Sequence, residues 1–254
     1  MGTVALVMRT PGASFQEDLQ QVQVDVTRLA TFVTEMLSDA MQALVEQDQA
    51  LADKVILDDE VADEIDLQVE QECMRLLALE QPRASDLRTI ATAMKVLADY
   101  ERIGDYAVDI AKSAKTLADE HYFKALVDIP RMGELTVSMS EAAARSFVDN
   151  DLELVQKVIE TDNEVERIWY HLLDELIDRM SRDPEIVPQA THLLLVARYL
   201  ERCADHVVNI AERVAYMTTG HSEDLADSHR PGHERPPSSY DPNEDLPDEK
   251  PDPA

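Results

Sequence analysis

The sequence contains few aromatic residues, glycines or cysteines, and its prolines are concentrated at one end. Aromatic residues make up 5% of the 254 residues, there are six glycines, and seven of the twelve prolines fall within residues 221–254. Strands are rich in aromatic and β-branched residues, so this composition argues against a sheet. It favours an all-α fold.

Positive charge is also scarce. Lys and Arg number 23 against 52 Asp and Glu, which gives a formal net charge of −29 at pH 7. Such a chain repels nucleic-acid phosphates and anionic lipid headgroups, so we expect no nucleic-acid binding. The charge suits a solvated surface, basic protein partners or bound cations.

Long apolar runs and cysteine motifs are missing too. No run reaches the roughly 20 apolar residues of a membrane span, and Val4–Met8 is too short for a signal-peptide core. Cys73 and Cys203 lie far apart without metal-ligand spacing, so both are predicted to be small core residues. We expect a cytoplasmic protein with no direct membrane insertion.

The two ends differ from the rest of the chain. Residues 221–254 combine the seven prolines with ten acidic and three basic side chains, and contain few apolar residues. Too little apolar surface is available to offset the entropy of ordering, so this acidic tail is predicted to be disordered. Residues 1–14 are interpreted as an N-terminal extension.

Between these ends, apolar residues recur at helical spacing. In the first segment they step by threes and fours from Leu19 to Ala43, which is typical of a helix in a bundle. The five prolines outside the tail lie where this pattern breaks. Five further helices are predicted at about 49–80, 85–118, 123–149, 151–181 and 187–218.

The sequence also repeats itself. Val45–Asp59 aligns with Val148–Asp162 at an offset of 103, and YERIGDYAVDIA from Tyr100 aligns with LERCADHVVNIA from Leu200 at an offset of 100. The offset changes near Pro82 and Pro184, in a turn where length changes are tolerated. The chain is therefore predicted to be two repeated three-helix bundles, 15–120 and 121–220, with pseudo-twofold symmetry.

Acidic residues four positions apart occupy equivalent places in both repeats. Each pair shares one helix face, where like charges repel by a few tenths of a kcal/mol unless a cation bridges them. The pairs are Glu101 with Asp105, Glu201 with Asp205, Asp59 with Asp63, and Asp162 with Glu166, and Asp109 extends the first row by a turn.

These pairs have two interpretations. Carboxylate ligands favour hard or borderline ions such as Mg²⁺, Mn²⁺ or iron, so the nine acids are candidate metal ligands. Alternatively, Arg102, Arg202 or Lys112 neutralises them on a solvated face. His206 follows Asp205 directly and could lend a nitrogen, whereas His171 and His192 are isolated in the sequence and are interpreted as packing or surface residues.

Three motifs carry a family resemblance. At YERIGDYAVDIAKSA (100–114), LERCADHVVNIAERV (200–214) and RLLALEQPRASDLR (75–88) the sequence resembles the PhoU family, and the likeness extends from about residue 15 to 219. The resemblance implies two three-helix bundles without catalytic activity, with ions or iron clusters held on the paired acids of some members. Cys203, Ala204 and Asn209 depart from the family pattern, so the second metal site is expected to be weaker.

The resemblance also implies a function. We expect a negative regulator of phosphate uptake and starvation signalling, a homodimeric adaptor that binds the ATPase subunit of a phosphate ABC transporter and a phosphate-sensing histidine kinase. These partners would recruit it to the inner face of the membrane. One alternative is a ferritin-like di-metal protein, which is disfavoured because no His follows a Glu by three positions. The other is an acidic helical scaffold with an unrelated partner.

Overall fold

The described part of the chain folds into six long helices, as predicted. The computed structural model describes residues 15–79, 82–221 and 225, and this part of the chain contains no strand. A short 3₁₀ turn, Pro184–Ile186, precedes the last helix. The helices are α1 Phe15–Glu46, α2 Gln49–Leu79, α3 Ala84–Leu117, α4 Asp128–Asp149, α5 Leu152–Arg182 and α6 Val187–Thr219.

The turns that end α1 and α4 are built in the same way. Gln47 and Asn150, 103 positions apart, adopt the left-handed backbone conformation with φ of 56° and 55°. The next residue in each case, Asp48 or Asp151, accepts bonds from the backbone N–H groups two and three residues further on. Such a carboxylate caps the first turn of the following helix. The repeat seen in the sequence is thus a repeat of local structure.

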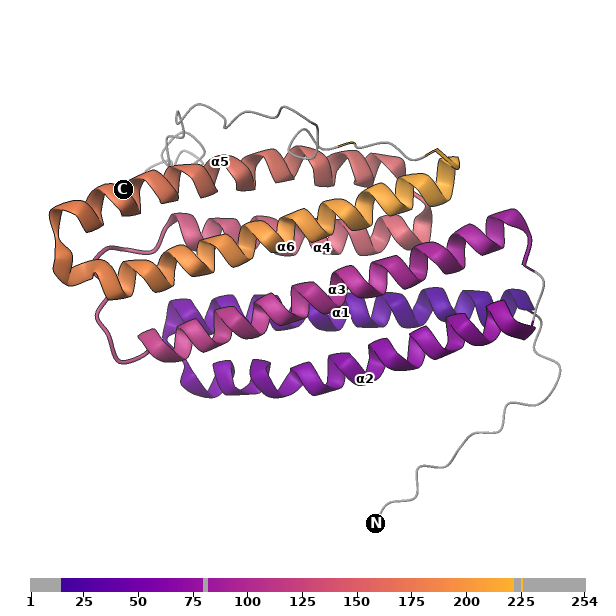
Figure 1. Cartoon of the computed structure of the whole chain (residues 1–254), viewed down its shortest axis with the longest axis horizontal. Helices are drawn as coiled ribbons and strands as arrows, with labels where there is room; N and C mark the ends of the chain where they lie inside the picture. The colour runs from indigo at the N-terminus through magenta and orange to yellow at the C-terminus, as the bar shows by residue number, and fades with distance from the viewer. Residues whose placement is uncertain (1–14, 80–81, 222–224, 226–254) are drawn as a thin grey trace, which may run out of the picture.

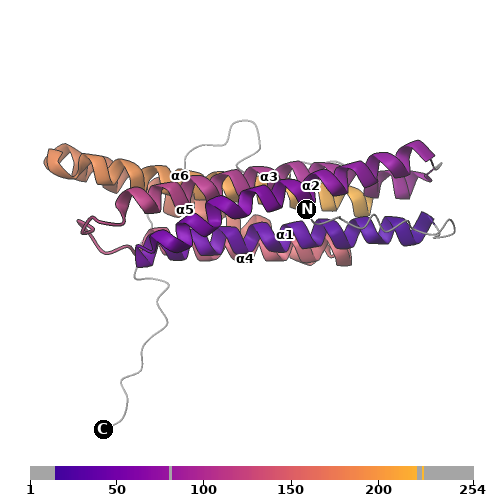
Figure 2. The ribbon, with the colours of Figure 1, turned by 90° about the horizontal axis from the view of Figure 1, so that it is seen from below.

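The helices form two bundles joined along a common interface. Helices α1, α2 and α3 pack together, as do α4, α5 and α6, while α1 contacts α4 and α3 contacts α6 across the junction. All six run roughly along the long axis, with α2 and α5 at opposite edges (Figure 1). Seen edge-on, α1 and α4 lie side by side in one layer (Figure 2). Each junction helix meets its own repeat counterpart, which confirms the predicted pseudo-twofold symmetry.

Side-chain contacts across the α3–α6 interface follow the same symmetry. The Nδ1 atom of His206 lies 2.9 Å from Oδ1 of Asp99, and the rings of Tyr106 and Tyr199 stack at 5.8 Å. Asp99 corresponds to Tyr199 and Tyr106 to His206 at the offset of 100, so each contact is the image of the other.

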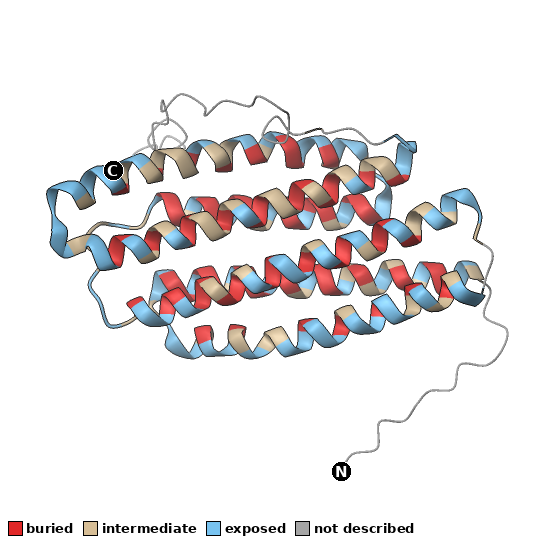
Figure 3. Cartoon of the chain, in the orientation of Figure 1, coloured by how far each residue is buried: buried red, intermediate tan, exposed pale blue. Residues whose placement is uncertain are grey.

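One continuous apolar core spans both halves. The predicted apolar rows of α1, α3 and α6 are buried throughout, and the buried positions face the interior of the layered bundle (Figure 3). Cys73 and Cys203 are free and buried in this core, and burial raises the pKa of the Cys73 thiol to about 12. Both cysteines are core residues, as predicted.

Two sequence predictions fall mostly outside the described residues. These are the N-terminal extension, 1–14, and the disordered acidic tail, 221–254, of which only His221 and Leu225 are described. The boundaries 15–120 and 121–220 stay predictions, with α1–α3 inside the first range and α4–α6 inside the second. Among the described helices, none has a stretch long and apolar enough to cross a bilayer.

Candidate functional site

The first half brings acids of α2 and α3 together on one face. Burial, followed by repulsion from Asp63, Asp105 and Asp109, raises the pKa of Asp59, and Lys112 opposes this rise. The α3 backbone approaches Asp59 closely: a Cβ at Gly104 would lie 3.9 Å from Oδ1 of Asp59. The predicted pairs of these two helices therefore lie near one another.

Glu101 lies near an acid that the sequence analysis missed. Burial and then Glu101, Glu70 and Asp63 raise the pKa of Asp66. The Oδ1 atom of Asp66 is buried and has no hydrogen-bond partner in the described part of the protein. Asp66 has an acid four positions on, Glu70, but their counterparts in the second half are Trp169 and Leu173, so the repeat did not reveal it.

Several outward-facing carboxylates already have cationic partners. Arg102 binds Asp105 at 3.0 Å, Lys112 binds Asp109 at 3.2 Å, and Arg202 lies 3.4 Å from Asp205. All are pairs three residues apart on a partly exposed surface, where an ion pair contributes about 0–1 kcal/mol. Ion pairs of the kind that the salt-bridge interpretation expects are thus present at these three acids, and their role as metal ligands stays a prediction.

The second half has a more buried version of the same arrangement. Asp162 of α5 is 6% exposed, and in α6 burial and the neighbouring Asp205 raise the pKa of Glu201 to about 7. Arg198 binds Oε1 of Glu201 at 2.5 Å, whereas Oε2 is buried without a hydrogen-bond partner among the described residues. Glu166 completes the four predicted acids of this half.

The two halves differ in charge because three equivalent positions carry different residues. Arg198 stacks over the Trp169 ring at 5.6 Å, and the first half has Ala98 and Asp66 at the equivalent places. The first half therefore presents six carboxylates at these positions and the second presents four, since Asn209 replaces Asp109. The first acidic face is the more negative of the two.

The carboxylates of these faces are suitable ligands for a hard cation, but their oxygen atoms are not gathered closely enough to share one. The unpartnered oxygens of Asp66 and Glu201 are donor atoms that a bound ion would satisfy. However, within the described ranges, ligand atoms of three residues come within 4.8 Å of one another only at Asp128, His171 and Glu175. The predicted pairs would have to rotate side chains to share an ion.

The histidines lie elsewhere than the sequence indicated. His206 points across the α3–α6 interface to Asp99, and Asn209 also reaches Asp99 at 3.5 Å. His171, interpreted from the sequence as isolated, lies beside Asp128 and Glu175. The HxxxE spacing of His171 and Glu175 was a sequence signal that these two side chains share a helix face. Asp128 belongs to α4, so its proximity to them could not be seen in the sequence.

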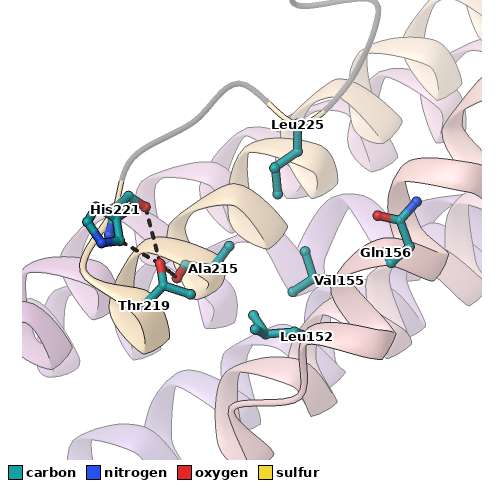
Figure 4. A pocket seen from close by; sticks show the side chains of 7 residues that line it. All are labelled: Leu152, Val155, Gln156, Ala215, Thr219, His221 and Leu225. Carbon is teal, nitrogen blue, oxygen red and sulfur yellow. Dashed lines mark hydrogen bonds between the residues drawn. The ribbon is translucent and has the colours of Figure 1, made fainter.

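An apolar pocket opens between the start of α5 and the end of α6. It has a volume of about 300 Å³ and is lined by the residues drawn in Figure 4, with Leu152 and Val155 on one wall and Leu225 across it. In the first half the equivalent of Gln156 and Ala215 is an ion pair between Asp53 and Lys115. The pocket is thus a feature of the second half.

Comparison with known families agrees with this two-part architecture. The sequence matches the PhoU domain twice, at residues 26–114 and 129–214. The chain belongs to the PhoU family. The first match lies within α1–α3 and the second within α4–α6, and each match includes two of the four predicted acidic pairs.

Curated PhoU relatives match most of the chain. The phosphate-specific transport system accessory protein PhoU homolog of Clostridium acetobutylicum is 35% identical over 214 residues, covering 84% of this chain and 98% of that protein. The homolog of the same name from Aquifex aeolicus is 38% identical over 204 residues, covering 80% and 92%. These names describe accessory proteins of phosphate transport.

Solved PhoU structures share the fold. PhoU from Pseudomonas aeruginosa superimposes with a TM-score of 0.80 at 32% identity, covering 82% of this chain and all of that one. The phosphate transport system regulatory protein PhoU from Streptococcus pneumoniae gives a TM-score of 0.78 at 31% identity, covering 84% and all of its chain.

Proposed function

We propose that this protein is a cytoplasmic negative regulator of phosphate uptake and phosphate-starvation signalling. It acts as a non-catalytic, homodimeric adaptor between the ATPase subunit of a phosphate ABC transporter and a phosphate-sensing histidine kinase, at the inner face of the membrane. The observation that carries this proposal is the double PhoU match over both halves, together with relatives named as phosphate transport accessory proteins.

The surface is suited to protein contacts of opposite charge. The chain has a net charge of −29, and the acidic faces run along the sides of long, rigid helices. Basic patches on the two partners would be attracted to such faces, and complementary charge raises association rates and selects among partners. Binding should therefore weaken as salt is added.

The first experiment measures alkaline-phosphatase output in a strain that lacks this gene and grows in abundant phosphate. High output, returned to low by the intact gene, is the result expected of a negative regulator. Output that stays low in the deletion strain contradicts the signalling role. A second assay measures binding of the purified ATPase subunit and kinase to the immobilised protein at physiological salt, and binding of neither partner would contradict the adaptor mechanism.

We also propose that the two acidic faces bind divalent ions such as Mg²⁺, Mn²⁺ or iron. Asp59, Asp63, Glu101, Asp105 and Asp109 would hold ions in the first half, and Asp162, Glu166, Glu201 and Asp205 in the second. A bound cation would offset the burial and the repulsion that raise the pKa of Asp59 and Glu201, and would reach the unpartnered oxygen of Glu201. The first half, with more carboxylates, should bind more tightly.

The metal proposal is tested by titrating metal-free protein with Mn²⁺ at constant ionic strength. Replacing Glu101 and Asp105 with Ala should remove the tighter ion, and the same change at Glu201 and Asp205 the weaker one. The matched control replaces Glu134 and Glu141, two exposed acids of α4, and should bind as the wild type does. Equal binding by all three double variants would contradict a site on these faces.

A further inference from the structure

A second kind of cation site lies where α4 begins. Asp128 is the first residue of α4, and His171 and Glu175 are one turn apart in α5. Each offers a ligand atom, and the three atoms lie within 4.8 Å of one another. Asp128 is 5% exposed, and its Oδ1 atom is buried without a hydrogen-bond partner in the described structure. Such an oxygen is costly to bury unless a cation or donor meets it.

The side chain of Lys124 already places one cation at this point. Its ammonium binds a carboxylate oxygen of Glu175 and lies 3.7 Å from Oδ2 of Asp128. Burial alone would raise the pKa of Glu175, but Lys124 and Arg179 together lower it. The arrangement is thus a pocket of two carboxylates and an imidazole whose geometry already accommodates positive charge.

This place is separate from the acidic faces described above. His171 follows Asp162 by nine residues and Glu175 follows Glu166 by nine, which is about half a turn away around the helix at about 100° per residue. The predicted pairs and the Asp128 cluster are therefore on opposite sides of α5. A metal bound at one would leave the ligands of the other unused.

A surface pocket gives a route from solvent to the cluster. The small cavity of about 10 Å³ beside Lys124 and Asp128 is otherwise lined by apolar side chains, so the space for an ion is the place that the Lys124 ammonium now occupies. Glu175 also lines a surface pocket of about 430 Å³ together with Phe123, Asp178 and Arg179. An ion from solvent can therefore approach the carboxylate of Glu175 through that pocket.

We propose that Asp128, His171 and Glu175 form a Zn²⁺ site in which the metal displaces the ammonium of Lys124. One imidazole nitrogen and two carboxylates are suitable Zn²⁺ ligands, and water completes a four-coordinate shell. Lys124 lies in the segment between α3 and α4, so its side chain can move toward solvent when the ion binds. The site would join the first turn of α4 to α5.

The first half provides an internal comparison. At the offset of 103, Asp128, His171 and Glu175 correspond to Asp25, Gln68 and Glu72. Glu72 is bound by Arg75 at 2.6 Å, and glutamine replaces the imidazole. Only one such site is therefore expected per chain, and glutamine at position 171 is compatible with the same helical setting.

The test titrates the full-length, metal-free protein with Zn²⁺ by calorimetry, and with Co²⁺ followed by visible absorption. Wild type should bind one ion with the spectrum of a tetrahedral nitrogen–oxygen site, in addition to ions held by carboxylates alone on the two acidic faces. His171→Gln should lose this ion, as should Asp128→Asn, which provides an independent second variant; circular dichroism establishes that each is folded. The control, with Glu101 and Asp105 both replaced by Ala, should keep it.

Lys124→Met separates a metal site from an ordinary ion-pair cluster. Removing the competing ammonium should tighten Zn²⁺ binding by about tenfold or more, because the carboxylates no longer have to release it. Binding by Lys124→Met no tighter than wild type would overturn the displacement, and unchanged Co²⁺ binding by His171→Gln would overturn the site. Neither result depends on phosphate signalling, so failure here is distinguishable from failure of the adaptor role.

Discussion

Glu101 and Glu201 occupy equivalent positions in the two halves, yet their surroundings differ. Glu101 faces Asp66, whereas Glu201 is bound by Arg198 and has one oxygen buried without a partner. Burial and Asp205 raise the pKa of Glu201 to about 7, so the folded protein holds a proton there that the unfolded chain would release at lower pH. The same residue type is thus held in two different environments in the two halves.

The raised pKa makes stability depend on pH. Between the unfolded pKa of about 4.5 and the folded pKa of about 7, the native state binds more protons, so the Glu201 contribution lowers the free energy of unfolding as pH rises. Since one pKa unit corresponds to about 1.4 kcal/mol and partial exposure reduces the effect, we expect a loss of about 1 kcal/mol.

Glu201→Gln, which mimics the protonated form, should remove this loss. Urea unfolding of the wild type and the variant at pH 5 and pH 8 measures this loss. The first pH lies between the unfolded and folded pKa values of Glu201, and the second lies about one unit above the folded pKa. The difference in unfolding free energy between the two pH values should shrink in Glu201→Gln and stay unchanged in the control Glu141→Gln, which replaces an exposed acid of α4. An equal pH dependence of wild type and Glu201→Gln would contradict the assignment.

At the scale of single elements, the ends of α1 and α4 share one backbone conformation but differ in side-chain bonding. Both Gln47 and Asn150 have positive φ, which is costly for residues other than Gly. The Gln47 amide, however, donates to the carbonyls of Leu117 and Glu120 at 2.7 Å each, and so ties this turn to the end of α3.

Substitution by Gly should therefore have opposite effects at the two turns. Asn150→Gly is expected to stabilise the protein by about 0.5 kcal/mol through relief of backbone strain. Gln47→Gly should instead destabilise it by about 1 kcal/mol, because the hydrogen bonds to the partly buried Leu117 carbonyl and the exposed Glu120 carbonyl are lost. Thermal and urea unfolding measure both, and a stabilised Gln47→Gly would show that the two bonds contribute little.

Helices α1 and α4 approach closely at a glycine. A Cβ at Gly133 would lie 2.9 Å from Cγ of Met41, so the methionine fills the space that a side chain at position 133 would take. At the offset of 103, Gly133 and Met41 correspond to Ala30 and Ala144, which are both small. The pairing of one small residue with one large residue is thus not repeated in the equivalent positions.

Gly133→Leu should destabilise the protein by about 1–3 kcal/mol through overpacking. Adding Met41→Ala to the same chain should recover part of this loss, since the leucine can then occupy the vacated space. A double-mutant cycle by urea unfolding measures the coupling, which is expected to be about 1 kcal/mol for residues in contact. Strictly additive effects would mean that the two side chains do not share that space.

At the scale of the whole molecule, the two halves share one core. The buried apolar residues form a single cluster that includes side chains from all six helices. Separating the halves would expose the α1–α4 and α3–α6 surfaces, which include the fully buried Tyr100 and Met132. Neither half can lose its structure without uncovering apolar surface of the other.

We therefore expect both halves to unfold in one transition. Differential scanning calorimetry should give a single peak whose calorimetric and van't Hoff enthalpies agree. Gly133→Leu, which lies at the junction, should shift the whole peak to lower temperature. Two resolved peaks, or a shift of only part of the transition, would show that the repeats behave as independent domains.

The sequence was sufficient for the architecture because the relevant signals are local or repeated. The steps from Leu19 to Ala43 depend on residues close together in the chain, and the offsets of 103 and 100 on comparison of two copies. Likewise, the i,i+4 acidic pairs share a helix face by helical geometry alone. Their role as metal ligands stays a prediction.

What only the tertiary structure decided is which residues of different helices meet. Asp66 beside Glu101, Arg198 between Trp169 and Glu201, and His206 against Asp99 all depend on how helices are rotated and aligned when the core packs. The grouping of Asp128 with His171 and Glu175 has the same origin. Periodicity fixes one face of each helix toward the core, whereas long-range packing sets the neighbours of the polar residues at its margins.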